Sequence, residues 1–81
     1  MQNLVKYTLE EVSTHDIEED CWIIIEGKVY DVTSYLNFHP GGGKLILEWA
    51  GKDATEQFKE AKHSTTAIQQ MEKYLIGEIS N

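Results

Sequence analysis

Cysteine and proline are almost absent from this sequence, which has one residue of each, Cys21 and Pro40. A small domain held together by disulfides needs at least one pair of cysteines, so a disulfide framework is excluded. A single thiol fits a reducing compartment. We therefore expect a cytoplasmic location, either for a soluble chain or for the cytosol-facing domain of a longer anchored protein.

Long apolar runs are also missing. No segment reaches the roughly 18 consecutive apolar residues that a membrane-spanning helix needs. The N-terminus, Met1 to Lys6, lacks the apolar stretch of a signal peptide. We expect no membrane anchor in this chain, which is either a free protein or a domain cut from a longer one.

Basic residues are scarce relative to acidic ones. The sequence has 7 basic and 14 acidic side chains and a net charge of −7. This balance disfavours nucleic acid and anionic membrane surfaces as partners. It favours docking to a basic protein surface, although the same charge also serves solubility alone.

What is present fits one small domain covering residues 1–81. The apolar fraction of 41% is sufficient for a globular fold, but a chain of this length buries only a modest core. A bound cofactor would add apolar surface and stabilise the folded state.

The first half of the chain predicts strands around one short helix. Val5 to Tyr7 has strand character, and Thr8 with Glu11 forms a capping box for a helix that ends near His15. The acidic segment 16–20 is expected to be a solvated loop. A hairpin follows, with strands over residues 21–25 and 29–32, because the first of these is rich in aromatic and β-branched side chains.

The second half predicts short helices and a final strand. Thr33 or Ser34 is expected to cap one helix, and residues 43–50 form the next, with Gly51 after its end. Asp53 and Glu56 resemble a second capping box, which opens a helix before His63. A helix from residue 65 to about 73 and a strand over residues 74–76 complete the chain. The strand is expected to break at Gly77, with resumption at Glu78-Ile79 left open. The fold class is α+β, a small mixed sheet with short helices forming two pairs around a cleft.

Two of the three histidines stand in unusual settings. Pro40 keeps His39 on a turn, and the glycines that follow allow the backbone to approach a flat ligand closely. His63 lies between two helical patterns and precedes residues that cap helices. We interpret His39 and His63 as two ligands of one flat iron cofactor. His15 is expected to be a surface histidine at a helix C-terminus.

Other uses of these histidines have less support. A structural zinc site usually needs four thiolate or imidazole ligands at short spacings, and this chain has a single cysteine. No nucleophile motif surrounds Ser34, Ser64 or Asp53, and helix capping accounts for all three.

From Tyr7 to Ile79 the sequence resembles the cytochrome b5 haem-binding domain. The segments that carry the resemblance are Tyr7-Thr8-Leu9-Glu10-Glu11, Trp22, Lys28-Val29-Tyr30-Asp31-Val32-Thr33, His39-Pro40-Gly41-Gly42, Ala50-Gly51-Lys52-Asp53-Ala54-Thr55, Phe58, His63-Ser64-Thr65 and Ile76-Gly77-Glu78. The resemblance implies one noncovalent haem b, with His39 and His63 as axial ligands of its iron. It also implies an electron carrier without a substrate reaction of its own.

The resemblance and the apolar pattern together suggest the residues around the cofactor. Trp22 is assigned to a second core on the far side of the sheet, and Ser64 to a haem propionate or to simple N-capping. The expected cofactor-binding residues are Ile25, Val32, Tyr35, Gly41, Gly42, Leu45, Ile46, Phe58, Ala61, Ser64, Ile68, Met71 and Leu75.

The expected partners are the basic surfaces of a flavin reductase and of an acceptor such as a desaturase or hydroxylase, with the chain itself a monomer. Glu48, Glu56 and Glu60 are the candidate docking residues. Lys44 and Lys62 depart from the family pattern and weaken the acidic patch near the haem edge. Two alternatives are the haem domain of a larger oxidoreductase and a haem-free interaction module, although relatives of the latter type lack the histidine pair.

Overall fold

A five-stranded mixed sheet organises the fold, with the strands in the order β1-β5-β4-β3-β2. The structure is a computed structural model, and it describes residues 4–36, 43–60 and 65–80. The strands are β1 (Val5–Tyr7), β2 (Asp16–Ile17), β3 (Asp20–Ile25), β4 (Lys28–Asp31) and β5 (Leu75–Ile79).

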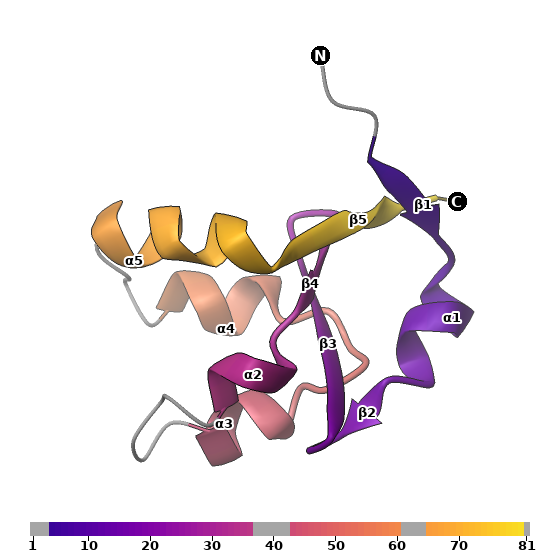
Figure 1. Cartoon of the computed structure of the whole chain (residues 1–81), viewed down its shortest axis with the longest axis horizontal. Coiled ribbons are helices and arrows are strands. Elements are labelled where there is room, and N and C mark those ends of the chain that lie inside the picture. Colours follow the sequence, from indigo (N-terminus) through magenta and orange to yellow (C-terminus); the bar gives the residue numbers. More distant parts are fainter. Residues whose placement is uncertain (1–3, 37–42, 61–64, 81) are drawn as a thin grey trace.

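Short helices surround the sheet. Helices α2 to α5 lie on one side of β3 in Figure 1, with α2 and α3 below α4 and α5, whereas α1 lies on the opposite side. The helices are α1 (Leu9–Ser13), α2 (Thr33–Leu36), α3 (Gly43–Leu47), α4 (Thr55–Glu60) and α5 (Thr65–Met71), and a 3-10 turn, η1 (Glu72–Tyr74), follows α5.

The hairpin of β3 and β4 forms the centre of the sheet. Ile25 pairs with Lys28, so the loop between the strands has only two residues, Glu26 and Gly27. Both have positive φ, 50° and 79°, which gives the tight turn whose twist matches that of the strands. This turn fixes the register and therefore decides which side chains of β3 face each side of the sheet.

Two apolar clusters occupy the two faces of the sheet. The larger is the helix-side cluster, whose buried members are Cys21, Ile23, Ile25, Val32, Ala50 and Ala54. The smaller is the α1-side cluster, formed by Val12, Ile24 and Val29 with Trp22 packed against them. The prediction that Trp22 belongs to a second core on the far side of the sheet is confirmed.

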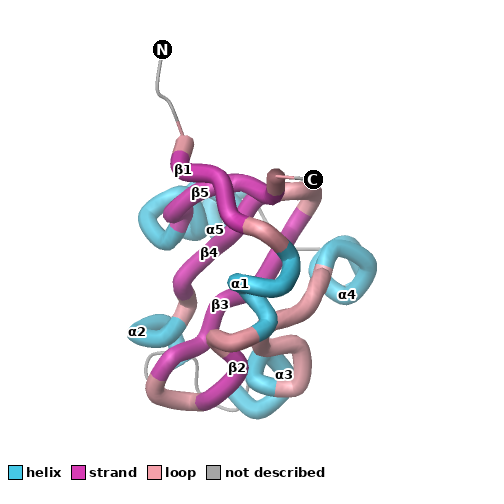
Figure 2. Tube along the Cα trace, turned by 90° about the vertical axis from the view of Figure 1, so that its right-hand side faces the viewer, coloured by secondary structure: helices cyan, strands magenta, loops and turns pink. Residues whose placement is uncertain are grey.

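The edges of the sheet correct two expectations. Asp16–Ile17 is not a loop but β2, which pairs with β3 through Asp16–Cys21 and Ile17–Asp20. Strand β5 is not broken at Gly77 but runs through it to Ile79. Gly77 is required there because a Cβ would lie 2.6 Å from Cε2 of Tyr7 on the parallel neighbour β1. Figure 2 shows β1 running beside β5.

Helix boundaries were predicted best where the signal is local. The capping box of α1 is present, since the Glu11 N–H donates to Thr8 Oγ1 at 3.0 Å and the Thr8 N–H donates to Glu11 Oε1 at 3.1 Å. Of the second capping box, only the Asp53 cap is present. The helix α4 starts at Thr55, whose N–H donates to Asp53 Oδ1 at 2.9 Å, and Glu56 makes no such bond to the described residues.

Helix α2 begins at Thr33, and the acceptor at its start is not Thr33 or Ser34 but Asp31, which accepts from the Thr33 N–H at 3.1 Å. Helix α3 ends at Leu47 and not at Ala50. The chain leaves the helix early because β3 binds the next segment. The Gly51 N–H donates to the Trp22 carbonyl at 2.6 Å, and the Ala54 N–H donates to the Ile24 carbonyl at 2.7 Å.

Candidate functional site

The helix side of the sheet carries a large, incompletely covered apolar surface. Ile23, Ile25 and Val32 are at most 6% exposed and form its floor. Half-buried side chains from every helix of this side pack against that floor. They are Tyr35 and Leu36 of α2, Ile46 and Leu47 of α3, Phe58 of α4, Met71 of α5 and Tyr74 of η1.

Local sequence explains how the short helices reach this surface. Thr33 begins α2 one residue after buried Val32, so Tyr35 and Leu36 follow within a single turn. Ile46 and Leu47 stand at the end of α3, and Phe58 lies on α4, whose start is fixed by Asp53. None of these helices exceeds seven residues, so their stability depends on the packing of their apolar faces.

Two tyrosines join α2 to the last helical turn. The rings of Tyr35 and Tyr74 meet edge to face, with centroids 5.5 Å apart. Burial, and secondly the neighbouring Tyr74, raises the pKa of the Tyr35 hydroxyl above its ordinary value. Tyr35 therefore stays neutral at physiological pH and serves the site as an aromatic surface.

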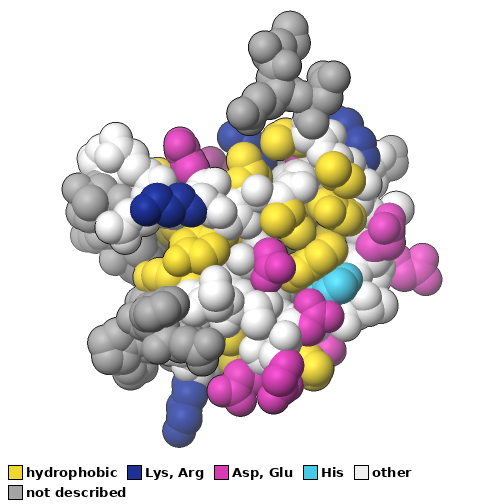
Figure 3. Space-filling view, in the orientation of Figure 1, with side chains coloured by type: hydrophobic (Ala, Val, Ile, Leu, Met, Phe, Trp, Pro, Cys, Tyr) yellow, Lys and Arg dark blue, Asp and Glu magenta, His cyan; other side chains and the backbone are white. Residues whose placement is uncertain are grey.

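One large apolar side chain of α5 remains open to solvent. Ile68 is 47% exposed, whereas Met71, three residues on, is half-buried against the helix-side cluster. Figure 3 shows hydrophobic side chains at the surface between the upper and lower helices. Helix α5 contains no charged residue, so this rim of the surface is neutral.

The predicted cofactor residues fall into three groups. Ile25 and Val32 are buried in the floor, whereas Tyr35, Ile46, Phe58 and Met71 surround it. Leu75 is half-buried on β5, opposite Tyr30, and Ile68 is the exposed residue of α5. The remaining predicted site residues, His39, Gly41, Gly42, Ala61, His63, Ser64 and the side chain of Leu45, lie outside the part of the chain that is described.

The sequence analysis missed Leu36, Leu47 and Tyr74, which join the same cluster. Leu36 directly follows Tyr35, and Leu47 directly follows Ile46. Adjacent apolar residues in one short helix are a signal that both sides of the turn are covered, and that signal was available. Tyr74 could not be found in this way, because the direction of its side chain depends on where α5 ends and η1 begins.

The predicted docking residues are all on the surface. Glu48, Glu56 and Glu60 are exposed, and so is Lys44. Lys59 of α4 forms an ion pair with Glu26, with Nζ 3.3 Å from Oε1. Lys62 lies outside the described residues. The exposed charges on this side therefore lie on α3, just after it and on α4, whereas α5 carries none.

The described residues fit a flat, largely apolar cofactor. A surface lined by aromatic and aliphatic side chains from four helices excludes water from the faces of such a ligand. Within the described segments, no group of three or more His, Cys, Asp or Glu residues could hold a metal ion. In those segments, no helix has the length and apolar character needed to cross a membrane.

A five-stranded mixed sheet with four short helices on one side and α1 on the other defines a cytochrome b5-like fold. The chain belongs to the family described as the cytochrome b5-like haem/steroid binding domain, which matches residues 8–80.

Curated relatives agree with this assignment. The chain is 56% identical over 72 residues to a cytochrome b5 of Brassica oleracea var. botrytis, a match that covers 89% of this chain and 54% of that protein. It is 52% identical over 73 residues to cytochrome b5 isoform D of Arabidopsis thaliana, covering 90% of this chain and 52% of the relative. The chain thus spans about half the length of the curated relatives it matches.

Solved structures show the same fold over the whole domain. Cytochrome b558 of Ectothiorhodospira vacuolata, a prokaryotic homologue of cytochrome b5, aligns with a TM-score of 0.85 and 40% identity, covering 94% of this chain and 99% of that one. The cytochrome b5 of Ostreococcus tauri virus 2 aligns with a TM-score of 0.80 and 41% identity, covering 91% and 95% respectively. The α+β fold class predicted from sequence is confirmed.

Proposed function

We propose that the chain binds one noncovalent haem b through His39 and His63 and carries single electrons. The observation that carries the proposal is the pair of histidine motifs, His39-Pro40-Gly41-Gly42 and His63-Ser64, within a family match that spans residues 8–80. The haem iron would supply the one-electron couple, and the chain would supply its ligands and its environment.

The described residues support this proposal through packing. Ile25 and Val32 form a buried apolar floor, and Phe58 and Met71 add side chains from α4 and α5. Such a surface holds a macrocycle by apolar burial and keeps water from its faces, which lowers the local dielectric. In the described segments, the half-buried side chains that α2 to α5 add to this surface are aliphatic or aromatic, so their proposed role is to bind and orient the haem.

The proposed ligand set limits the chemistry. If His39 and His63 both hold the iron, no ligand position would remain open for oxygen or substrate. We therefore propose that the protein is an electron carrier and not an enzyme. Because neither ligand is a thioether, the reduction potential is expected to lie below that of a His/Met cytochrome.

The proposed partners are a flavin reductase that donates electrons and an acceptor such as a desaturase or hydroxylase, each with a basic docking surface. The net charge of −7 and the exposed Glu48, Glu56 and Glu60 favour such partners. The half-length match to the curated relatives favours one further reading, in which this domain acts as the haem module of a longer protein.

The test is a visible spectrum of the purified, haem-loaded protein, oxidised and then reduced with dithionite. A six-coordinate low-spin spectrum is expected, and His39→Ala and His63→Ala should each abolish it. His15→Gln is the matched control, because His15 contacts Asp20 and Trp22 and belongs to the other side of the sheet. An unchanged low-spin spectrum in either of the first two variants would exclude that residue as a ligand.

A further inference from the structure

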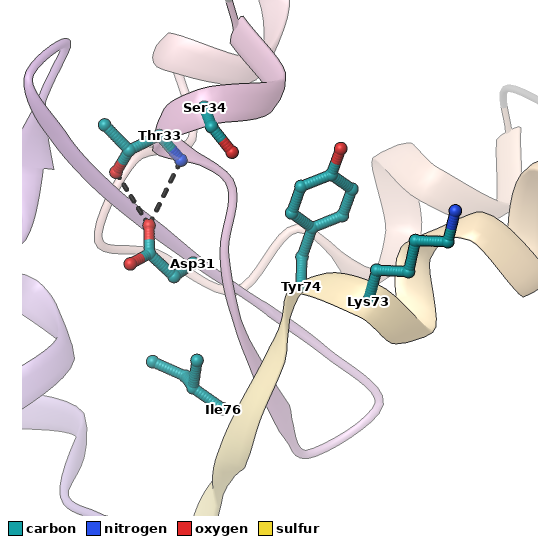
Figure 4. Close-up of a pocket in the computed structure, with 6 residues that line it drawn as sticks. All are labelled: Asp31, Thr33, Ser34, Lys73, Tyr74 and Ile76. Atoms are coloured by element: carbon teal, nitrogen blue, oxygen red, sulfur yellow. Dashed lines mark hydrogen bonds between the residues drawn. The ribbon is translucent and has the colours of Figure 1, made fainter.

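A surface hollow of about 530 Å³ lies at the corner where β4 turns into α2. Asp31, Thr33 and Ser34 line it from β4 and α2, Lys73 and Tyr74 from η1, and Ile76 from β5. In Figure 4, Asp31 and Ser34 stand on one side of the Tyr74 ring, and Lys73 extends on the other side. The expected cofactor residues are not among the side chains that line this hollow.

The carboxylate of Asp31 is held in a fixed orientation. The Thr33 N–H and hydroxyl both donate to Asp31 Oδ1, at 3.1 and 2.7 Å. The Thr33 hydroxyl oxygen in turn accepts from the Cys21 N–H of β3 at 2.8 Å. A carboxylate that is anchored through one oxygen is already ordered, so a ligand that binds its other oxygen loses little side-chain entropy.

Several polar groups around this carboxylate have no partner within the described part of the chain. Among the described residues, no hydrogen bond reaches Asp31 Oδ2 or the hydroxyl of Ser34. Lys73 Nζ has no carboxylate within 4.0 Å in the described segments. A preset carboxylate oxygen, a free hydroxyl and an aromatic ring therefore converge on one concavity.

We propose that this hollow is the receptor for an arginine side chain of a basic partner protein. A guanidinium is planar and delocalised, so it binds a carboxylate oxygen and stacks on an aromatic face at the same time. Its aliphatic stem fits against Ile76, and Ser34 offers a further acceptor. None of the 81 residues is an arginine, so a second copy of this domain would not supply the side chain. The net charge of −7 draws a basic surface toward the site.

Lys73 lowers the expected affinity of the hollow for arginine. It is exposed and extends away from Asp31 past Tyr74, so it leaves the carboxylate accessible (Figure 4). A like charge at the rim still opposes a cation, although solvent screens it. Removing this charge should therefore strengthen the binding of arginine.

The test uses N-acetylarginine amide as probe, titrated into the haem-loaded, reduced full chain and followed by 15N–1H NMR. Amide shifts are expected to concentrate at Asp31, Thr33, Ser34 and Tyr74. N-acetylglutamine amide, which has no charge, should cause no such shifts, and N-acetyllysine amide should bind more weakly. Shifts spread evenly over the exposed acidic residues would overturn the proposal.

Variants then distinguish binding in the hollow from general attraction by the net charge. Asp31→Asn keeps an oxygen for the two Thr33 bonds but removes the charge, and it should weaken arginine binding by about fivefold, the effect of one exposed ion pair. Glu18→Gln removes the same charge from an exposed position outside the hollow and should leave the affinity unchanged. Lys73→Gln should raise it. Equal affinity in the wild type, Asp31→Asn and Lys73→Gln would exclude this site, and the dispersed NMR spectrum verifies that each variant is folded.

Discussion

His15 and Trp22 stack face to face, with ring centroids 3.5 Å apart and planes inclined by only 3°. Asp20 holds the imidazole in place, since its carboxylate lies 2.7 Å from His15 Nδ1. Both residues were assigned from sequence to ordinary structural roles, but His15 does more than end a helix. It joins the turn after α1 to the first residues of β3 and covers one face of the Trp22 indole.

This stack leads to a prediction on stability. His15→Ala should lower the free energy of unfolding by about 1 kcal/mol, the scale of one aromatic pair. His15→Phe keeps the ring but loses the contact with Asp20, and it should cost less, because Asp20 is 46% exposed and solvent weakens that contact. Urea unfolding followed by tryptophan fluorescence measures both losses. An equal loss in both variants would show that the contact with Asp20, which both of them remove, is the dominant one.

Removal of haem should lower the melting temperature markedly. A ligand that binds only the folded state adds stability, and the helices that carry the proposed site are too short to persist alone. The α1-side cluster of Val12, Ile24 and Val29 is independent of that surface. Hydrogen exchange on the apoprotein should therefore show loss of protection in α2 to α5 and retained protection in β3 and β4. Apo and holo forms that melted together would place the cofactor outside the core.

Electron-transfer rates with a basic partner should fall as salt is added, because exposed charges are screened beyond about 8 Å at physiological ionic strength. Charge reversal of Glu48 and Glu60 together should slow reduction, and Lys44→Glu should accelerate it. A double reversal of Glu18 and Glu19, which are exposed on the segment between β2 and β3, provides a control of equal net charge. Stopped-flow reduction across a salt series measures the rates. If the control slowed reduction as much as the helix variants, net charge rather than a local patch would direct docking.

Alkaline pH should destabilise the fold through Cys21. Burial, followed by the nearby Asp31 and Asp20, raises the pKa of this thiol from 9.0 to about 11. Between these values the unfolded chain has released the proton and the folded chain keeps it, so stability falls as pH rises through this window. Burial also raises the pKa of Tyr30, with Glu72 and Glu26 adding to the effect, and this acts in the same direction.

Cys21→Ala isolates the thiol from the tyrosines. Its unfolding free energy should decline less steeply than that of the wild type between pH 9 and 11, by about 1–2 kcal/mol over the window, while a slope due to tyrosine remains. The thiol of the native protein should also react slowly with iodoacetamide at pH 8, since Cys21 is fully buried. Parallel pH profiles of the two proteins would argue against a role for the thiol.

The sequence predicted most of what depends on near neighbours. The capping box of Thr8 and Glu11 is encoded within four residues and is present. The hairpin turn expected over residues 26–28 is also present, although it is shorter, since Lys28 already belongs to β4. The second capping box is incomplete because the segment before α4 is bonded to β3, where the Ala54 N–H donates to the Ile24 carbonyl at 2.7 Å, and the helix therefore starts only at Thr55. That contact comes from a residue far away in the sequence, so no local pattern announces it.

Parts of the sheet and of the site were beyond local reasoning for the same reason. Strand β2 consists of two exposed residues and has no alternation to detect. Gly77 resembled a strand break, although its missing Cβ is what admits the neighbouring strand. Ile25 and Val32 were identified by their apolar segments, whereas Tyr74 was missed because its position depends on the end of α5.

The pairing of β1 with β5 gives the domain a direction of mechanical strength. The two strands are parallel and joined at Val5–Gly77, Lys6–Glu78 and Tyr7–Ile79, with an ion pair of 2.9 Å between Lys6 and Glu78. Force that pulls the start of β1 and the end of β5 apart acts along both strands in opposite senses. It therefore shears all the bonds of this ladder together instead of opening them one after another. A domain loaded through these strands would resist tension until the whole ladder yields.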